Sequence, residues 1–308
     1  MSVYTEVGRD ALAEWLAPLG LGELIDHAGI AAGMQNSNYF VTTTAGRYVL
    51  TLFEAIPPAE LDFYLQLQET LADRGLPCPR PQRDASGRRW RLLAGKPAAL
   101  LSRLAGQPVE NPSVAQCAAL GAMLARLHLA AADFRGAPPN PCGAAWCAEQ
   151  GQALLPLLAT EDAALLADEL AFQAQQSTAT LPGGVIHADL FRDNALWDAH
   201  GQLAGVLDFY FAGVDCWLFD LAVVVNDWCP DAACFAALCA GYAECRPLTP
   251  AEQLAWPAVR RLAALRFWLL RLDAKYRPRP GSVVTVKNPE TFRHLLQHIR
   301  LAPGALPG

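Results

Sequence analysis

The sequence lacks the features that mark zinc-binding, secreted or membrane-spanning proteins. Its nine cysteines are scattered and form no CxxC pair, which argues against a zinc site and favours reduced thiols packed as small apolar side chains. The first residues include Glu6, Asp10 and Glu14, whereas a secretory signal has a basic start and an apolar run. No stretch reaches the roughly 20 uninterrupted apolar residues of a membrane span. We therefore expect a cytoplasmic protein without a membrane anchor.

Charged residues are also scarce. They make up 18% of the chain, and the formal net charge is -6. General nucleic-acid binding needs a basic face that displaces counterions, so this balance disfavours it. Hydrophobic residues make up 53% of the 308 residues, enough for a large core, and the length suits one long domain or two lobes around a cleft.

The first third of the chain has the patterns of β-strands. Residues 38–43 and 47–54 are rich in β-branched and aromatic side chains, and a turn at 45–46 between them predicts a hairpin. Two more strands are expected at 90–93 and 98–102. Helices are expected at 9–20 and from Pro57 to about 74, ending at Gly75.

Helical patterns dominate from Pro112 onward. They are interrupted by three short segments with strand character, at 184–186, 195–197 and 203–207. We place the boundary between the two lobes near 102–112, with a strand-rich part over 1–104 and a mainly helical part over 105–308. The helices are expected to begin at Pro112 and to cover 148–158, 161–176, 217–228, 232–244, 250–275 and 289–300.

One constellation of polar residues indicates chemistry. His187, Asp189 and Asn194 have the spacing HxDxxxxN, and Asp208 follows an apolar run. Phosphoryl transfer needs a group that orients the attacking hydroxyl and accepts its proton, and it needs oxygen ligands for Mg²⁺ on the phosphates. Asp189 suits the first role, and Asn194 and Asp208 suit the second. Turn formation would explain each Asp or Asn alone, but not the whole pattern.

This pattern resembles the catalytic and metal loops of the protein-kinase-like fold. The small Ala188 between His187 and Asp189 is similar to the small-molecule branch of that fold, which includes aminoglycoside and choline kinases. The likeness covers roughly residues 5 to 300 and is closest to homoserine kinases of the aminoglycoside-phosphotransferase-like type. The segments that carry it are GMQNSNYF at 33–40, YVLTLFE at 48–54, LFDLA at 218–222, NDW at 226–228, LRFWL at 265–269 and VTVKNP at 284–289.

The resemblance implies a two-lobed α+β protein-kinase-like architecture with ATP in the cleft. It also implies transfer of the γ-phosphoryl group of ATP to the hydroxyl of L-homoserine, a step in threonine biosynthesis. Asp189 would then deprotonate the hydroxyl, and Asn194 and Asp208 would hold Mg²⁺. His187 and Asp220 would shape the loop, although Asp220 could instead cap the helix that it opens.

The nucleotide would be held mainly by backbone groups of the first lobe. A polar loop without a ligand explains 33–38 equally well, and backbone contacts at the hinge over 98–104 leave little trace in side chains. The residues expected to bind the nucleotide are Gly33, Asn36, Ser37, Asn38, Ser102 and Leu104.

Thr51 departs from the usual pattern of the fold. It stands where related kinases carry a Lys or Arg that reaches the α- and β-phosphates, and the sequence does not say what replaces that charge. A nucleotide-binding pseudokinase is the alternative that Thr51 suggests. The intact set of Asp189, Asn194 and Asp208 speaks against it.

Homoserine is a zwitterion, so its pocket should offer an anion for the ammonium and a cation for the carboxylate. Asp227 and Arg266 are the candidates, with Trp228 and Trp268 as walls. Snorkelling is the default interpretation for Arg266. Packing explains the two tryptophans as well as a role in the pocket does. Other small hydroxyl compounds remain possible acceptors: an amino alcohol, a sugar, or an aminoglycoside, which as a polycation would need a strongly acidic cleft.

Five further polar positions are expected to be structural. Asp193 and Asp198 suit turns. His128 is typical of a histidine within a packed helix. Glu60 and Glu69 are expected on the solvated face of the helix that follows Pro57.

Overall fold

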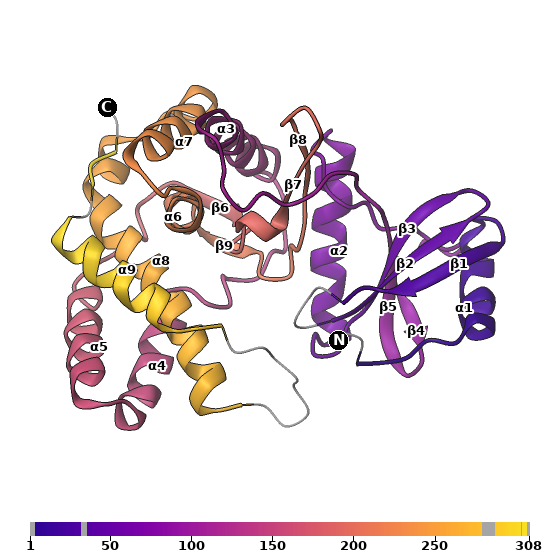
Figure 1. Ribbon diagram of the computed structural model, residues 1–308, viewed down its shortest axis with the longest axis horizontal. Helices are drawn as coiled ribbons and strands as arrows, with labels where there is room; N and C mark the ends of the chain where they lie inside the picture. The colour runs from indigo at the N-terminus through magenta and orange to yellow at the C-terminus, as the bar shows by residue number, and fades with distance from the viewer. Residues whose placement is uncertain (1–3, 32–35, 279–286, 303, 307–308) are drawn as a thin grey trace. The chain divides into compact units, whose positions relative to one another are not determined.

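The computed structural model describes residues 4–31, 36–278, 287–302 and 304–306. Its internal contacts divide the chain into two compact units, the first extending to Ala105 and the second beginning at Gly106. Strands are concentrated in the first unit and helices in the second, as Figure 1 shows along its colour scale. The predicted α+β class, with a strand-rich first part and a helical second part, is confirmed.

The first unit contains a five-stranded antiparallel sheet in the order β1-β2-β3-β5-β4. The predicted hairpin is formed by β2 and β3, with Thr43 opposite Gly46 at its turn. Side chains of β2 alternate between buried and half-buried, as expected for a strand with one face on a core. The strands are β1 (Leu24–Gly29), β2 (Ser37–Thr43), β3 (Gly46–Leu52), β4 (Arg91–Leu93) and β5 (Lys96–Ser102).

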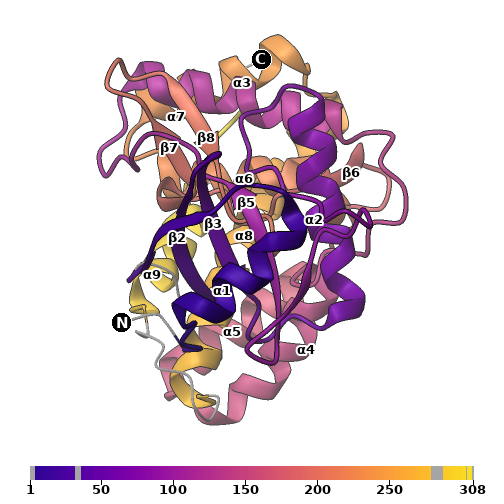
Figure 2. The same ribbon diagram turned by 90° about the vertical axis from the view of Figure 1, so that its right-hand side faces the viewer.

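Two helices complete this unit. Helix α1 (Arg9–Leu16) lies against the sheet (Figure 2), and its buried residues Leu12, Trp15 and Leu16 share a core with those of the sheet. Gly20 ends the short 3-10 turn after α1 with a φ of 67°. Helix α2 (Pro58–Asp73) has Pro58 in its first turn, where a missing N–H leaves no helical hydrogen bond unmade. Gly75 follows α2 with a φ of 80°, a left-handed conformation that glycine adopts without a steric penalty.

The second unit carries two small antiparallel sheets. Strand β6 (Gly183–Ile186) pairs with β9 (Gly213–Cys216), and β7 (Ala195–Trp197) pairs with β8 (Leu203–Val206). The β7–β8 hairpin brings the residues before β7 alongside those after β8, because the backbone N–H of Leu207 donates to the carbonyl oxygen of Asn194 at 2.8 Å.

Helices make up most of the second unit. Helices α3 and α8 begin with capping boxes, in which the side chains of the N-cap and of the third helical residue satisfy each other's backbone N–H groups. No helix within the described residues is long and apolar enough to cross a membrane. The helices are α3 (Val114–Ala130), α4 (Ala144–Leu154), α5 (Thr160–Gln173), α6 (Trp217–Trp228), α7 (Ala232–Cys245), α8 (Pro250–Tyr276) and α9 (Glu290–Leu301).

Helices α3 and α7 lie side by side at glycines, in backbone-to-backbone contact. A Cβ added at Gly121 would lie 2.0 Å from the carbonyl oxygen of Leu238, and one added at Gly241 would lie 2.1 Å from that of Ala118. Neither backbone atom can move without displacing its helix. The close approach of α3 and α7 therefore depends on glycine at both positions.

We expect Gly121→Ala to lower the free energy of unfolding by about 1–3 kcal/mol, because overpacking forces the helices apart. Alanine favours an isolated helix over glycine by about 1 kcal/mol, so the clash has to outweigh that gain. Urea denaturation measures the difference, with Arg126→Ala at an exposed position of the same helix as the control. A variant as stable as the wild type would contradict this account of the helix pair.

Candidate active site

A buried carboxylate holds the loop that follows β6. Asp220, on α6, accepts the backbone N–H of His187 at its Oδ2 and that of Ala188 at its Oδ1, both at 2.8 Å. Burial alone would raise the pKa of Asp220, but its hydrogen bonds, led by that from His128, outweigh burial and hold the pKa below its usual value. Asp220 is thus ionised and braces the loop backbone.

A chain of buried polar groups supports Asp220 from behind. His128 of α3 donates its Nε2–H to Asp220 Oδ2 at 3.0 Å, and its Nδ1 lies 2.8 Å from the hydroxyl of Tyr242. Arg246 donates to the same hydroxyl at 3.2 Å, so Tyr242 donates its own proton to His128. Burial lowers the pKa of His128, which is consistent with this neutral tautomer. His128 is the structural helix histidine that the sequence predicts.

The loop is strained at Ala188. Its φ of 64° lies in the left-handed region, which non-glycine residues avoid at a cost of roughly 1–2 kcal/mol. Asp220 binds its N–H, and Arg266 of α8 donates to its carbonyl oxygen. The two side chains clamp both ends of one strained residue. Arg266 is fully buried, with its guanidinium 4.6 Å from the ring centre of Phe267.

His187 connects the loop to the end of β8. Its Nδ1 accepts the backbone N–H of Asp189 at 3.2 Å, and its Nε2 donates to the carbonyl oxygen of Leu207 at 2.8 Å. The ring is buried and packs against Phe209, with 4.6 Å between ring centres. Because Asp208 lies between these two residues, His187 ties together the two segments that carry the acids.

Asp189, Asn194 and Asp208 lie on two segments that hydrogen bonds hold side by side. The amide nitrogen of Asn194 donates to the carbonyl oxygen of Asp189 at 2.7 Å, which orients the amide and leaves its Oδ1 as the possible ligand atom. Asp208 has a φ of 60° and is reached by solvent, whereas Asp189 is half-buried.

The two carboxylates are crowded electrostatically. Burial first, and the charge of Asp208 second, raise the pKa of Asp189 to about 8. Burial first, and the charge of Asp193 to a smaller extent, raise the pKa of Asp208 to about 6, although water reaches its side chain. Raised pKa values of paired acids are typical of functional sites, where a ligand or a substrate proton resolves the repulsion.

A pocket of about 470 Å³ adjoins this loop. Phe191, Arg192 and Asp193, which directly follow the Asp189 segment, form part of its wall. Asp227 also lies there, but it already accepts the backbone N–H of Arg192 at 2.8 Å and its side chain at 3.2 Å. The pocket is lined by Pro108, Val109, Glu110, Phe191, Arg192, Asp193, Asp227, Arg271 and Lys287.

The other substrate candidates from the sequence do not line that pocket. Arg266 lies beneath the loop, directed at Ala188. Trp228 and Trp268 are fully buried, and the indole N–H of Trp228 donates to the carbonyl oxygen of Leu190 at 3.1 Å. Packing therefore accounts for both tryptophans in this structure.

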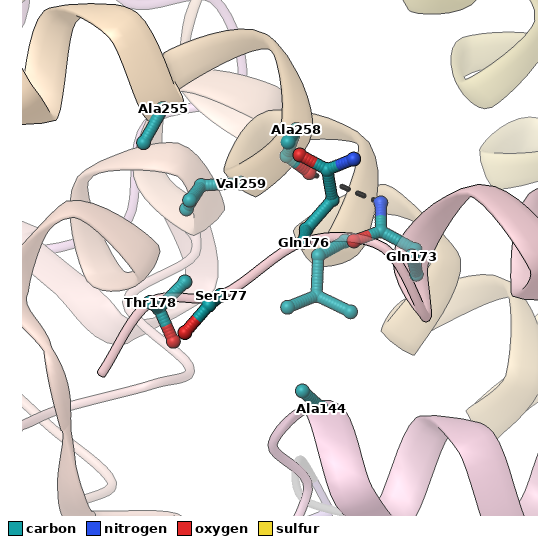
Figure 3. Close-up of a pocket in the computed structure, with 9 residues that line it drawn as sticks. Ala144, Gln173, Gln176, Ser177, Thr178, Ala255, Ala258 and Val259 are labelled. Carbon is teal, nitrogen blue, oxygen red and sulfur yellow. Dashed lines mark hydrogen bonds between the residues drawn. The ribbon is translucent and has the colours of Figure 1, made fainter. Parts of the chain in front are cut away.

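A second, smaller pocket lies among α4, the end of α5 and α8 (Figure 3). Its volume is about 50 Å³, and it contains no residue of the loop. The amide of Gln173 donates to the carbonyl oxygen of Ala258 at 3.1 Å across one side of it. It is small and none of the described residues that line it is charged, so we assign it no function.

Most of the expected nucleotide residues of the first unit are described. Gly33 lies outside the described residues, Asn36 is buried, and Leu104 is half-buried. Ser37 Oγ donates to Glu54 at 2.7 Å, and Ser102 Oγ accepts the N–H of Arg80 at 2.9 Å.

Thr51 and Asn38 bond each other across the β2–β3 pair. The hydroxyl of Thr51 donates to Asn38 Oδ1 at 2.7 Å, and Thr51 is buried. The Thr51 hydroxyl thus links the two strands through a buried side-chain hydrogen bond.

The expectation of a solvated face was wrong for Glu69. Its side chain is buried, and Arg83 and Arg89 donate to it at 2.6 Å and 2.7 Å. Both arginines come from the segment before β4, so this ion cluster ties that segment to α2. Glu60 is exposed as expected.

A braced loop bearing one carboxylate, with an amide and a second carboxylate on the adjoining hairpin, defines a phosphotransferase of the protein-kinase-like class. The model of the phosphotransferase enzyme family (APH) matches residues 26–271, and the chain belongs to this family. The resemblance noted in the sequence is confirmed.

Among relatives with curated names, homoserine kinases are similar to this chain over nearly its full length. The chain is 46% identical to a homoserine kinase of Methylobacillus flagellatus, over 97% of this chain and 95% of the relative. It is 43% identical to a homoserine kinase of Neisseria meningitidis, over 96% and 99%.

Solved structures show the same fold at low identity. Amicoumacin kinase hAmiN, in complex with AMP-PNP and Ca²⁺, aligns with a TM-score of 0.71 and 15% identity, over 94% of this chain and 92% of that one. Choline kinase LicA of Streptococcus pneumoniae aligns with a TM-score of 0.68 and 14% identity, over 95% and 98%.

The raised pKa of Asp189 predicts a stability effect. An aspartate in an unfolded chain has a pKa of about 3.9, whereas the pKa of Asp189 in the folded protein is about 8. The stability that protonated Asp189 contributes is therefore complete below about pH 4 and is lost as the pH rises to about 8. We expect Asp189→Asn, which is neutral at every pH, to raise the melting temperature at pH 8 by roughly 2 °C or more. The gain should shrink towards pH 5.

Asp198→Asn is the matched control for these melts. Backbone N–H groups, that of Gln202 first, lower the pKa of Asp198, so removing its charge should bring no gain at pH 8. A melting temperature of Asp189→Asn at or below the wild-type value at pH 8 would show that the Asp189 carboxylate is not electrostatically destabilised.

Proposed function

We propose that this chain is a homoserine kinase, which transfers the γ-phosphoryl group of ATP to the hydroxyl of L-homoserine and yields O-phospho-L-homoserine, a step towards threonine. The observation that carries the proposal is the convergence of Asp189, Asn194 and Asp208 at a loop clamped by Asp220. The names of the full-length relatives support the choice of acceptor.

Asp189 orients the acceptor hydroxyl and takes its proton. A carboxylate with a pKa raised to about 8 is a stronger base than a free aspartate, and a base whose pKa lies near the working pH is the effective one. Asn194 and His187 fix the backbone on which Asp189 stands. These contacts hold the base in place before the acceptor arrives, so less ordering is needed in the transition state.

Mg²⁺ fits the donor set of this site. The amide oxygen of Asn194 and the carboxylate of Asp208 are hard oxygen ligands, and a divalent cation would relieve the effect of the Asp208 charge on Asp189. When bound, Mg²⁺ neutralises charge on the phosphates of ATP. Asn194 and Asp208 are the residues that would hold it.

We assign nucleotide binding to residues 1–104, and the catalytic loop and acceptor pocket to 105–308. Backbone groups of the first part would contact the nucleotide, and Thr51, bonded to Asn38, brings no positive charge to the phosphates. The residues proposed for the nucleotide are Gly33, Asn36, Ser37, Asn38, Ser102 and Leu104.

The test of the proposed function is ADP release from ATP and Mg²⁺ with homoserine, serine, threonine, choline and sugars as acceptors. We expect homoserine to give the highest kcat/KM. A better acceptor elsewhere in the panel would reassign the substrate, and no release with any acceptor would refute a kinase.

Asp189→Ala should lower kcat by at least about 100-fold, because it removes the proton acceptor and leaves the metal ligands in place. Binding of ATP, measured by calorimetry, should be nearly unchanged. Asp10→Ala, at an exposed carboxylate of α1, is the control. Near-normal kcat in Asp189→Ala would exclude Asp189 as the base.

Asp208→Ala should raise the Mg²⁺ concentration needed for half-maximal activity by at least about tenfold, because it removes a charged ligand. Circular dichroism checks that the variant folds. An unchanged Mg²⁺ dependence in a folded variant would mean that Asp208 does not bind the metal.

A further inference from the structure

The pocket beside the loop has balanced charges. Its lining contains three acids and three bases, so its formal charges cancel. A polycationic acceptor would meet as many cations as acids there. A small zwitterion, with one group of each sign, finds both kinds of partner. The charged residues are Glu110, Asp193, Asp227, Arg192, Arg271 and Lys287.

Two of the three cations are already engaged. Arg192 bonds Asp227 at 3.2 Å and the carbonyl oxygen of Glu110 at 2.7 Å. Lys287 lies 3.5 Å from the carboxylate of Asp193. Neither is available to a ligand without losing a contact that the folded protein makes.

Arg271 differs from both. Among the described residues, no acid lies within ion-pair distance of its guanidinium. One of its nitrogens donates to the carbonyl oxygen of Asn288 at 2.7 Å, and the group lies 4.5 Å from the ring centre of Phe292. These two contacts hold the planar guanidinium of Arg271 in position without neutralising its charge.

The surroundings of Arg271 favour an anionic ligand. Its side chain is half-buried on α8; burial lowers the pKa of its guanidinium, and the charge of Asp227 partly opposes this shift. Partial desolvation strengthens an ion pair with a ligand, and a guanidinium binds a carboxylate through two parallel hydrogen bonds. A held, partly desolvated arginine in a pocket is therefore suited to a carboxylate.

The position of the pocket matches the reaction. Its wall includes Phe191, Arg192 and Asp193, from the same loop as Asp189. Homoserine carries its hydroxyl two methylene groups from the carbon that bears the ammonium and the carboxylate. A head group held in the pocket can therefore extend its hydroxyl towards the neighbouring base.

We propose that the pocket binds the head group of the acceptor, with Arg271 binding its α-carboxylate and Glu110 receiving its ammonium, an inference that rests on the proposed function. Arg271 thereby takes the role that the sequence suggested for Arg266, which binds the loop backbone instead. Asp227 positions Arg192.

The first arm of the test compares acceptors on the wild-type protein. 3-Aminopropan-1-ol is homoserine without its carboxylate, and it keeps the ammonium and the hydroxyl at the same spacing. We expect its kcat/KM to be lower than that of homoserine by about 10- to 100-fold, the value of a hydrogen-bonded charge pair. Equal use of both acceptors would overturn the proposal without any variant.

The second arm changes the arginine. Arg271→Gln should raise KM for homoserine by about 10- to 100-fold and leave the constants for 3-aminopropan-1-ol unchanged, so that selectivity for the carboxylate is lost. Arg271→Lys, which keeps the charge but not the planar guanidinium, should fall between Arg271→Gln and the wild type. Arg126→Gln, at an exposed arginine of α3, is the control.

Two measurements keep the outcome decisive. Melting curves establish whether each variant folds. If Arg271→Gln does not fold, Arg271→Lys and the comparison of acceptors on the wild type test the proposal instead. A folded Arg271→Gln with KM within about twofold of the wild type and with selectivity retained overturns the proposal, while the proposed function stands.

Failure of the proposed function is read separately. If the wild type releases no ADP with homoserine, calorimetry with AMP-PNP present still measures homoserine binding. Binding by the wild type and by Arg126→Gln, but not by Arg271→Gln, supports the carboxylate site on its own. No binding by the wild type overturns the site together with the function.

Discussion

The geometry of the active site depends on one buried carboxylate. Asp220 sits on α6, inside the helical unit, and it accepts two consecutive backbone N–H groups of the loop that carries Asp189. An unpaired buried carboxylate would be costly, so each of these bonds satisfies the carboxylate as much as it restrains the loop. The left-handed conformation of Ala188 persists because Asp220 and Arg266 bind its two ends. Helix packing, rather than the loop sequence alone, therefore sets the direction of Asp189.

The support behind Asp220 reaches the start of α8. Tyr242 bonds both His128 and Arg246, and Arg246 donates to Glu252 at 2.7 Å. Glu252 is also the capping residue that accepts the N–H of Thr249 at 2.9 Å. One continuous hydrogen-bonded path thus runs from a helix cap, through a neutral histidine, to the loop. Arg266, further along the same helix, reaches the loop from a second point.

Local sequence patterns predicted most of the helices and strands. Which side chains meet depends on contacts between residues far apart in the sequence. The helix expected at 217–228 matches α6 to the residue, because an apolar run and the acid at 220 lie within it. Strand β9 is not among the predicted strands, and it gains its identity from pairing with β6. The local pattern around Glu69 does not reveal its burial, because its arginine partners follow it by 14 and 20 residues. Arg266 and Arg271 share α8, and only tertiary contacts tell which of them faces the loop backbone and which the pocket.

The balanced charges of the pocket bear on how an acceptor reaches it. Long-range attraction needs a net field, and three acids opposed by three bases leave little field beyond about 8 Å, the screening length at physiological ionic strength. A zwitterion has no net charge for such a field to act on. The acceptor then reaches the pocket by ordinary diffusion, and its association rate should not depend on the salt concentration. Acceptors are distinguished only after they enter, by the contacts that set their dissociation rates.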